Sequence, residues 1–409
     1  MTPLLRGIRV VEVGAVVLAP LAGQILGDLG ADVIKVEPLS GDVARDSHPR
    51  NAGDGALFIN NNRNKRMITL DLKHPLGHQA LAKVIGTSDV FLHNMRIDAA
   101  KRLKLSFEDV RKINPRIVYC EAIGFGQRGQ YRDRPAYDDI IQAASGLAGL
   151  SAERGGDPDF VPTIVADKVA ALHVVYGILA ALLARARGLE DSVRVEIPMF
   201  ETMVSFVLNE HLAGATFAEV GALGYPRLMS RDRRPHPTLD GWIAVLPYTK
   251  QQWVRFLKEI GREDICQEPW FVDGRKRQSY IDHLYAIVAE SLRSRTTKDW
   301  MTALSACDVP CSEVNRLQDL MSDPHLNEIG FFDVDPTFPP EIRRTLPQPV
   351  HFDGVERQPD RPPTNLGRDT RLVLLECGHD DAMIDDLIQA GVAHADEATA
   401  RPSAPGRSA

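Results

Sequence analysis

The stretch IRVVEVGAVVLAPLAGQILGDLGADVIKVE, residues 8–37, decides the fold of this chain. It opens with a run rich in β-branched residues, Ile8–Val13, which predicts a short strand. Pro20–Leu29 then follows a helical pattern and ends at Gly30, a residue that favours helix C-termini. A second strand is predicted over Asp32–Glu37. Strand, helix and strand in this order indicate a βαβ unit with parallel strands.

The same alternation continues through the first half of the chain. Further strands are predicted at Met67–Leu72, Val90–His93, Arg116–Ala122 and Ser192–Ile197, and helices at Gly77–Ile85, Ser106–Ile113 and Ala166–Arg187. Strands that alternate with helices of this length predict an α/β fold around a mostly parallel sheet.

The composition of the sequence changes after Gly221. The stretch GYPRLMSRDRRPHPTLDG combines prolines with a cluster of arginines, which is typical of a segment that passes from one domain to another. We therefore predict a large domain over residues 1–220 and a smaller α/β domain over 221–332. The proline-rich stretch after residue 333 is expected to return the chain to the large domain over 333–393. The polar, Pro/Ala/Ser-rich tail, 394–409, is predicted to be disordered.

Composition narrows the classes of protein that this chain can be. Among its 409 residues 44% are hydrophobic and 25% are charged, as in ordinary globular proteins, and the net charge of −7 argues against a nucleic-acid surface. The five scattered cysteines favour reduced thiols, and hence a cytoplasmic protein. The N-terminus runs directly into a strand pattern without a signal peptide. The most apolar segment, Val169–Ala186, is interrupted by His173 and is expected to be a buried helix, so no membrane partner is expected.

Two motifs suggest a dinucleotide enzyme, and both are weak. The first loop, GAVVLAP, lacks the glycines that let backbone N–H groups approach a pyrophosphate. A literal G-x-G-x-x-G occurs at 124–129, but the QYRDRP that follows opens no helix, so the helix-terminus phosphate site is missing. The sequence also shows neither metal-ligand spacing nor a G-x-S-x-G elbow, and no metal is expected.

Asp167 is the most informative single residue. It lies in the first turn of the long apolar helix, within TIVADKVAALHVVYG. One interpretation is an acid that complements the helix dipole. The other is a carboxylate that acts as a nucleophile or a base. Sequence position alone leaves both interpretations open.

Several segments, in the same order along the chain, resemble family III CoA-transferases, also called the CaiB/BaiF family. Besides the opening stretch they are NRNKRMITLDLK, DVFLHNMR, GFGQRGQY, RPAYDDIIQAASGL, IVADKVAALHVVYGILAALLAR and LGRDTRLVLLECG. The resemblance covers the chain up to about Gly391. It implies a Rossmann-like large domain built from both ends of the chain, a smaller α/β domain from the middle, and an interlocked homodimer.

The resemblance also implies an activity and a set of site residues. The family transfers CoA between an acyl-CoA and a carboxylic acid, and its nucleophilic aspartate falls on Asp167. The expected intermediates are an aspartyl mixed anhydride and an aspartyl-CoA thioester. Coenzyme A or acyl-CoA is then a substrate, and no tightly bound cofactor is expected. The aromatic active-site position falls on Tyr137. The CoA contacts map onto Arg66, Lys73, Asn94, Arg96 and Arg102.

Two alternatives stay open at this point. The family contains 2-methylacyl-CoA racemases, in which a histidine stands where this chain has Tyr137 and an asparagine where it has Thr163. Because a tyrosine titrates near ~10, it is a poor base at neutral pH, and both differences favour a transferase. The second alternative is a family member that binds CoA without turnover. The chain also differs from formyl-CoA transferase, with Val17 and Pro135 at the positions of a glutamine and a lysine, which disfavours oxalate as the acceptor acid.

Overall fold

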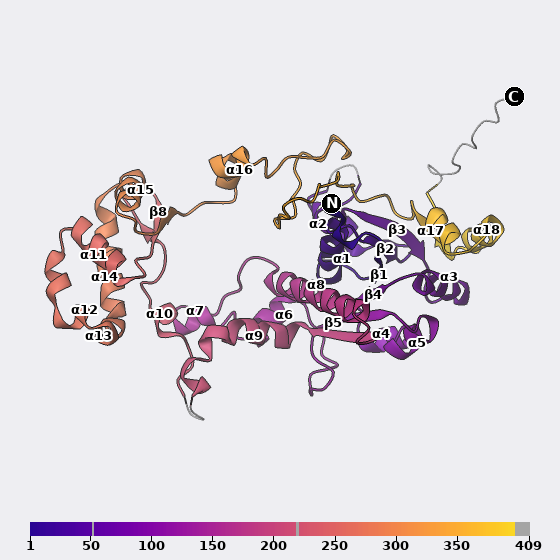
Figure 1. Cartoon of the computed structure of the whole chain (residues 1–409), viewed down its shortest axis with the longest axis horizontal. Helices are drawn as coiled ribbons and strands as arrows, with labels where there is room; N and C mark the ends of the chain where they lie inside the picture. Colours follow the sequence, from indigo (N-terminus) through magenta and orange to yellow (C-terminus); the bar gives the residue numbers. More distant parts are fainter. Residues whose placement is uncertain (51–52, 218–220, 397–409) are drawn as a thin grey trace. The chain divides into compact units, whose positions relative to one another are not determined.

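The computed structural model describes residues 1–50, 53–217 and 221–396 (Figure 1). Its main feature is a seven-stranded sheet with the strand order β10-β3-β2-β1-β4-β5-β6. The strands are β1 (Arg9–Val13), β2 (Asp32–Glu37), β3 (Lys65–Leu70), β4 (Val90–His93), β5 (Val118–Ile123), β6 (Val193–Pro198) and β10 (Ala393–His394). The predicted α/β fold is confirmed.

All neighbouring strands of this sheet are parallel except β10, which pairs antiparallel with β3. Val10 on β1 is opposite Val33 on β2 and Val90 on β4, so β1 lies in the middle. The order 3-2-1-4-5-6 is that of doubly wound dinucleotide-binding sheets, in which ligands bind beyond the carboxyl ends of the strands.

The central strands β1, β4 and β5 are buried on both faces, which explains their largely apolar sequences, whereas the edge strand β6 is only partly buried. Successive residues of a strand point to opposite faces. Val10 accordingly belongs to a core that includes residues of α1 (Leu18–Asp28) and α8 (Val165–Ala186). Val11 belongs to a second core that includes residues of α3 (Pro75–Gly86), α17 (Thr370–Glu376) and α18 (Asp381–Gln389).

The helices of the sheet-bearing part frame these two cores (Figure 1). They are α1 (Leu18–Asp28), α2 (Ala56–Asn62), α3 (Pro75–Gly86), α4 (Ile97–Arg102), α5 (Phe107–Ile113), α6 (Asp138–Ala144), α8 (Val165–Ala186), α17 (Thr370–Glu376) and α18 (Asp381–Gln389). α9 (Met199–His211) begins directly after β6.

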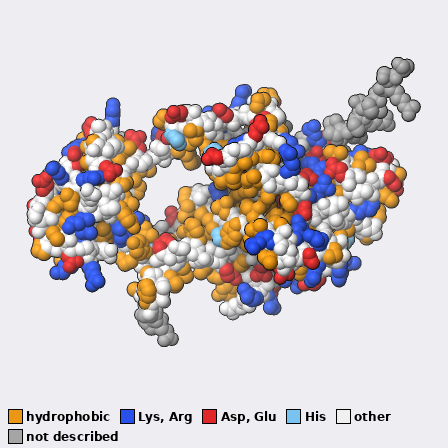
Figure 2. Space-filling view, in the orientation of Figure 1, with side chains coloured by type: hydrophobic (Ala, Val, Ile, Leu, Met, Phe, Trp, Pro, Cys, Tyr) orange, Lys and Arg blue, Asp and Glu red, His pale blue; other side chains and the backbone are white. Residues whose placement is uncertain are grey.

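The apolar helix α8 packs against the sheet along one face only. In the part of the chain that the structure describes, it alone has the length and composition of a membrane span, a property that core helices share. Ala170, Val174 and Ile178 are fully buried in the core shared with α1. Its opposite face is exposed, and Figure 2 shows hydrophobic side chains gathered over it.

The chain divides into two compact units. One comprises 1–147, 160–206 and the chain from 331 onward; the other comprises 148–159 and 207–330. The second unit has a three-stranded antiparallel sheet, β7-β8-β9, formed by His236–Pro237, Trp242–Val245 and Cys311–Glu313. Its helices are α7 (Leu150–Glu153), α10 (Pro226–Met229), α11 (Lys250–Glu259), α12 (Pro269–Val272), α13 (Gly274–Ser279), α14 (Ile281–Ser291), α15 (Thr297–Ala306) and α16 (Pro324–Glu328). Most of the predicted disordered tail, from 397 to 409, lies outside the described residues.

Candidate active site

A cavity of about 370 Å³ opens at the carboxyl edge of the central sheet. The loops that leave β1, β4 and β5 line it, together with Tyr137 before α6 and Asp167 on α8. This is the edge at which open α/β sheets bind their ligands. The cavity belongs entirely to the sheet-bearing unit.

Asp167 is a partly buried carboxylate in the wall of this cavity. Burial and the nearby negative charge of Asp138 raise the pKa of Asp167 to about 6, while a hydrogen bond from the backbone N–H of Leu18 acts in the opposite direction. The carboxylate is therefore mostly ionised at neutral pH. It is also more basic than an ordinary aspartate, which makes it a better nucleophile.

The N-terminus of α8 is capped by Asp138 rather than by Asp167. Asp138 Oδ1 accepts hydrogen bonds from the backbone N–H groups of Ala166 at 2.6 Å and Asp167 at 3.2 Å. Gln142 Nε2 donates to the other oxygen of Asp138 at 2.7 Å and holds it in place. Because another residue satisfies the helix end, the Asp167 side chain is left to face the cavity.

The loop that presents Leu18 N–H to Asp167 runs from Gly14 to Val17. Val16 has a φ of 69°, in the left-handed region that a β-branched residue rarely adopts. Asn94 holds the preceding residue from both sides: its Oδ1 accepts from Ala15 N–H at 3.1 Å and its Nδ2 donates to Ala15 C=O at 2.9 Å. Such a backbone conformation persists only where its surroundings enforce it.

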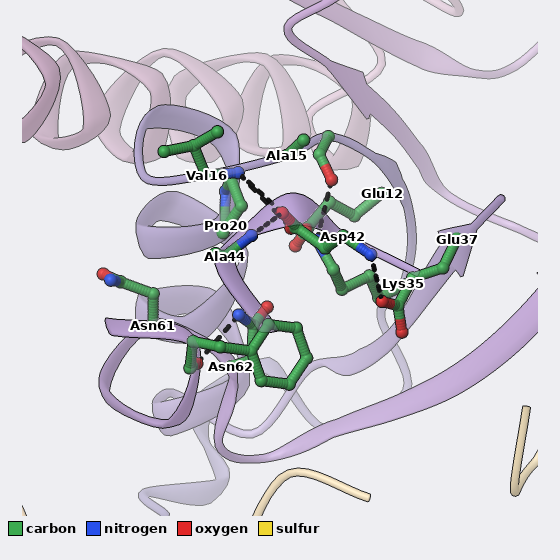
Figure 3. A network of polar contacts seen from close by, with 12 residues as sticks. Glu12, Ala15, Val16, Pro20, Lys35, Glu37, Asp42, Ala44, Asn61 and Asn62 are labelled. Carbon is green, nitrogen blue, oxygen red and sulfur yellow. Dashed lines mark hydrogen bonds and ion pairs between the residues drawn. The ribbon is translucent and has the colours of Figure 1, made fainter. Parts of the chain in front are cut away.

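Buried charges complete the support of this loop (Figure 3). Lys35 Nζ donates to Gly14 C=O at 2.7 Å and pairs with Asp42 at 2.9 Å and Glu12 at 3.1 Å. Asp42 in turn accepts from Val16 N–H at 3.2 Å. The positive charge of Lys35 and the negative charge of Asp42 therefore hold the strained loop on either side of Ala15, at Gly14 C=O and Val16 N–H.

Lys65 extends this buried network toward α1. It pairs with Glu12 at 2.8 Å and donates to Pro20 C=O at 2.7 Å. Burial and the nearby Lys35 charge lower the pKa of Lys65 to about 8, against the opposing effect of Glu12. Gly23 on α1 lets the helix approach the Glu12 carboxylate, since a Cβ there would lie 2.0 Å from Glu12 Oε2.

A second cavity of about 580 Å³ lies next to the first along α4. Lys73, His74 and Pro75 at the start of α3 form one side, and Lys104 contributes a further cation. Ala99 and Arg102 line both cavities. Three cationic side chains, Arg102, Lys104 and Lys73, therefore lie between the cavity of Asp167 and the N-terminus of α3.

Most of the residues predicted for the site lie around these two cavities. The first is lined by Asp167, Tyr137, Asn94, Arg96 and Arg102, and the second by Lys73 and Arg102. Arg66 lies outside both. Its guanidinium pairs with Asp32 at 2.6 Å and with Glu376 at 2.8 Å.

Sequence reasoning did not find the groups that position the acid. The interaction of Asp138 with α8 and the Leu18 N–H group depend on tertiary structure. Lys35 and Glu12 did carry a signal, because each is a charged residue with apolar neighbours on both sides inside a strand. Charged residues are almost never fully buried unless they are paired.

The described part of the chain contains no group of three His, Cys, Asp or Glu side chains placed to hold a metal ion. No histidine is among the residues that line the first cavity. Among the described residues around Asp167, the arrangement thus offers a carboxylate, a backbone N–H donor and arginines.

Comparison with known proteins gives a consistent result. The family model described as CoA-transferase family III matches residues 5–370. A succinate–glutarate CoA-transferase from Agrobacterium fabrum is 29% identical over 393 residues, which cover 91% of this chain and 96% of the relative. A (R)-2-hydroxy-4-methylpentanoate CoA-transferase from Clostridioides difficile is 25% identical over 400 residues, covering 94% and 98%.

Among solved structures, a CaiB/BaiF family protein from Brucella suis is similar with a TM-score of 0.77 at 25% identity. The match covers 92% of this chain and 100% of that one. The similarity thus extends over both compact units.

Proposed function

This chain belongs to CoA-transferase family III and is a CoA-transferase, and we propose that it works through covalent intermediates on Asp167. Its substrates are an acyl-CoA and a carboxylic acid. The observation that carries the proposal is that Asp167 lines the cavity while Asp138 takes the helix-capping role at α8.

The first half of the proposed reaction frees the donor acid. The Asp167 carboxylate attacks the thioester carbonyl carbon of the acyl-CoA, and the CoA thiolate leaves. A mixed anhydride of the acyl group and Asp167 results. The thiolate then attacks the Asp167 carbonyl, so that the acyl group leaves as a carboxylate and an aspartyl-CoA thioester remains.

The second half repeats these steps in reverse with the acceptor. The acceptor's carboxylate attacks the aspartyl thioester and expels the thiolate. A second anhydride, between the acceptor acid and Asp167, results. The thiolate then attacks the acceptor's carbonyl, which yields the new acyl-CoA and returns Asp167 as a carboxylate. No net proton is taken up or released. Water must be kept from the anhydride, and the partial burial of Asp167 favours this.

The two adjoining cavities suit the two ends of a CoA thioester. We propose that Arg96 and Arg102 contact the CoA moiety near the reacting end, and that Lys73 contacts its phosphate-bearing end. Lysine and arginine are the side chains that bind phosphates in proteins. Tyr137, 75% exposed, is proposed to contact the acyl group in the first cavity.

The decisive test is the variant Asp167→Asn. It keeps the size of the side chain and removes the nucleophile, so exchange between an acyl-CoA and an acid should fall by at least about 10³-fold while CoA binding stays measurable. With the unaltered protein, incubation with acyl-CoA followed by hydroxylamine should leave a hydroxamate on Asp167 that mass spectrometry detects.

Asp139→Asn is the matched control, because this exposed neighbour of Asp138 lines neither cavity. It should leave exchange unchanged. Retained turnover in Asp167→Asn, or a hydroxamate on another residue, would disprove the mechanism. Incubation in deuterated water without an acceptor acid tests racemisation, and α-deuterium in a 2-methylacyl-CoA would favour that alternative.

We also propose that two copies form a homodimer and that the protein is cytoplasmic. The exposed apolar face of α8 supports the dimer: Leu172, Tyr176 and Leu183 are 57%, 58% and 59% exposed and recur at helical spacing. All five cysteines are unpaired, which supports a reducing compartment.

A further inference from the structure

Arg134 is an exposed arginine that lines the same cavity as Asp167. Its guanidinium carbon lies 3.8 Å from the ring centroid of Tyr131, so the planar group is close over an aromatic face. A guanidinium stacked in this way keeps its N–H groups free at the edge, where they can bind a carboxylate with two parallel hydrogen bonds.

The aromatic platform under Arg134 is anchored in the core. Tyr131 contacts Phe125 edge to face, with centroids 5.7 Å apart, and lies 6.2 Å from Phe200. Phe125 is 4% exposed and belongs to the core shared by α1 and α8. The backbone N–H of Arg134 also donates to Tyr131 C=O at 2.9 Å. Arg134 is therefore held before any ligand binds, which lowers the entropic cost of recognition.

Within the described chain Arg134 forms no ion pair, as is also true of Arg96 and Arg102, whereas Arg132 pairs with Asp133 at 3.4 Å. Among the described arginines of this cavity, Arg134 is the one that stacks on an aromatic ring. Arg102 reaches the second cavity, where the proposed CoA phosphates would lie. Arg134 is thus a pre-positioned cation whose negative partner is missing from the protein itself.

We propose that Arg134 binds the second carboxylate of a dicarboxylic acid, and that this acid is the acceptor or the acyl donor at Asp167. The inference rests on the proposed function. One carboxylate of such an acid reacts with Asp167, and the other keeps its charge throughout the exchange. A monocarboxylic acid offers Arg134 nothing to bind, so the residue sets the choice between the two classes.

The test compares a dicarboxylate with a monocarboxylate of similar length, glutarate against pentanoate, in Arg134→Met. The unbranched Met can still cover Tyr131 but carries no charge. A lost charge-assisted hydrogen bond should lower the ratio of kcat/KM for glutarate over pentanoate by about 10- to 100-fold. Arg134→Lys should recover part of the ratio, because it restores the charge without the planar fork.

Arg128→Met is the matched control, since Arg128 is exposed in the same loop but does not line the cavity. It should leave the ratio as in the unaltered protein. An unchanged ratio in Arg134→Met would overturn the inference. So would a raised KM for acyl-CoA with an equal loss for both acids, because Arg134 would then contact CoA phosphate.

These outcomes separate the inference from the proposed function. If the acyl adduct forms on Asp167 and both acids react equally well in every variant, only the role of Arg134 is wrong. If no adduct forms on Asp167 with either acid, the covalent mechanism is wrong, whichever acid is preferred.

Discussion

At the scale of single residues, Asp138 on α6 and Asp167 on α8 meet at the N-terminus of α8 and have different roles. Asp138 accepts the backbone hydrogen bonds that a helix terminus requires, and its charge raises the pKa of Asp167. Asp167 carries the carboxylate that we propose to react. Asp138 therefore leaves the proposed nucleophile free of helix capping and also makes it more basic.

This division predicts the pH dependence of the enzyme. Under the proposed mechanism Asp167 must be ionised to attack. Because its pKa is raised to about 6, kcat/KM should fall as the pH decreases through about 6. In Asp138→Asn the neutral amide oxygen still accepts from α8, but the like charge is gone. The acid limb of the profile should then move to lower pH, as initial rates between pH 4.5 and 8 would show.

Asp139→Asn serves again as the control, and its profile should match that of the unaltered protein. An acid limb that stays in place in Asp138→Asn would mean that burial alone raises the pKa of Asp167. A limb that moves equally in both variants would point to a general effect of surface charge.

The sequence alone predicted the candidate nucleophile but not the residues that act on it. A carboxylate in the first turn of an apolar helix is visible in TIVADKV, and the family resemblance selected Asp167 as the nucleophile. The role of Asp138 was not visible, because its hydrogen bond joins residues 28 positions apart. The stacking of Arg134 on Tyr131 likewise depends on how one loop folds back on itself.

At the scale of elements, the loop between β1 and α1 is held in place by buried charges. Lys35 binds the carbonyl of Gly14, and Asp42 binds the N–H of Val16. The loop leads to Leu18, whose N–H reaches Asp167. Strand β2 and the loop that follows it thus supply the charges that shape the loop next to Asp167.

Lys35→Met should destabilise the sheet-bearing unit strongly. It would leave Glu12 and Asp42 buried with less compensating charge, and removing one partner of a buried pair costs about 3–5 kcal/mol. Urea denaturation followed by circular dichroism measures the change. Lys112→Met is the control, because this exposed lysine lies 3.8 Å from Asp109 and such pairs contribute about 1 kcal/mol or less.

Asp42→Asn tests the positioning role if Lys35→Met fails to fold. The amide oxygen can still accept from Val16, but the charge that pairs with Lys35 is lost. We expect kcat to fall by about tenfold or more with little change in the KM for acyl-CoA, as for an interaction made in the transition state. A raised KM with an unchanged kcat would instead assign this loop to substrate binding.

The sequence predicted the central strands of the sheet more accurately than the short helices and the edge strand around them. The bounds of β2 and β4 agree with the predicted strands, because turn-favouring residues stand close to both ends of each strand. α2 and α9 were not predicted. The strand β10 pairs only two residues with β3, and so short a strand carries no pattern of its own.

At the scale of the whole molecule, the exposed stripe of α8 predicts association. Leu172→Glu places a charge on the stripe of Leu172, Tyr176 and Leu183, which a second copy would cover. Sedimentation velocity should show a dimer for the unaltered protein and a shift to monomer for the variant. Leu189→Glu is the control, since Leu189 is 64% exposed but lies beyond the end of α8. A monomeric unaltered protein would refute the proposed dimer.

The position of Arg102, where the two cavities meet, has a consequence for how fast CoA is released relative to the acids. Arg102 lines both the space around Asp167 and the space beside Lys73. Under the proposed mechanism, the thiolate released in each step belongs to a CoA that is still held by its phosphate-bearing end. The donor acid can then leave and the acceptor acid can bind while the same CoA molecule stays bound through both halves of the reaction. We therefore expect labelled free CoA in solution to be incorporated far more slowly than the acids are exchanged.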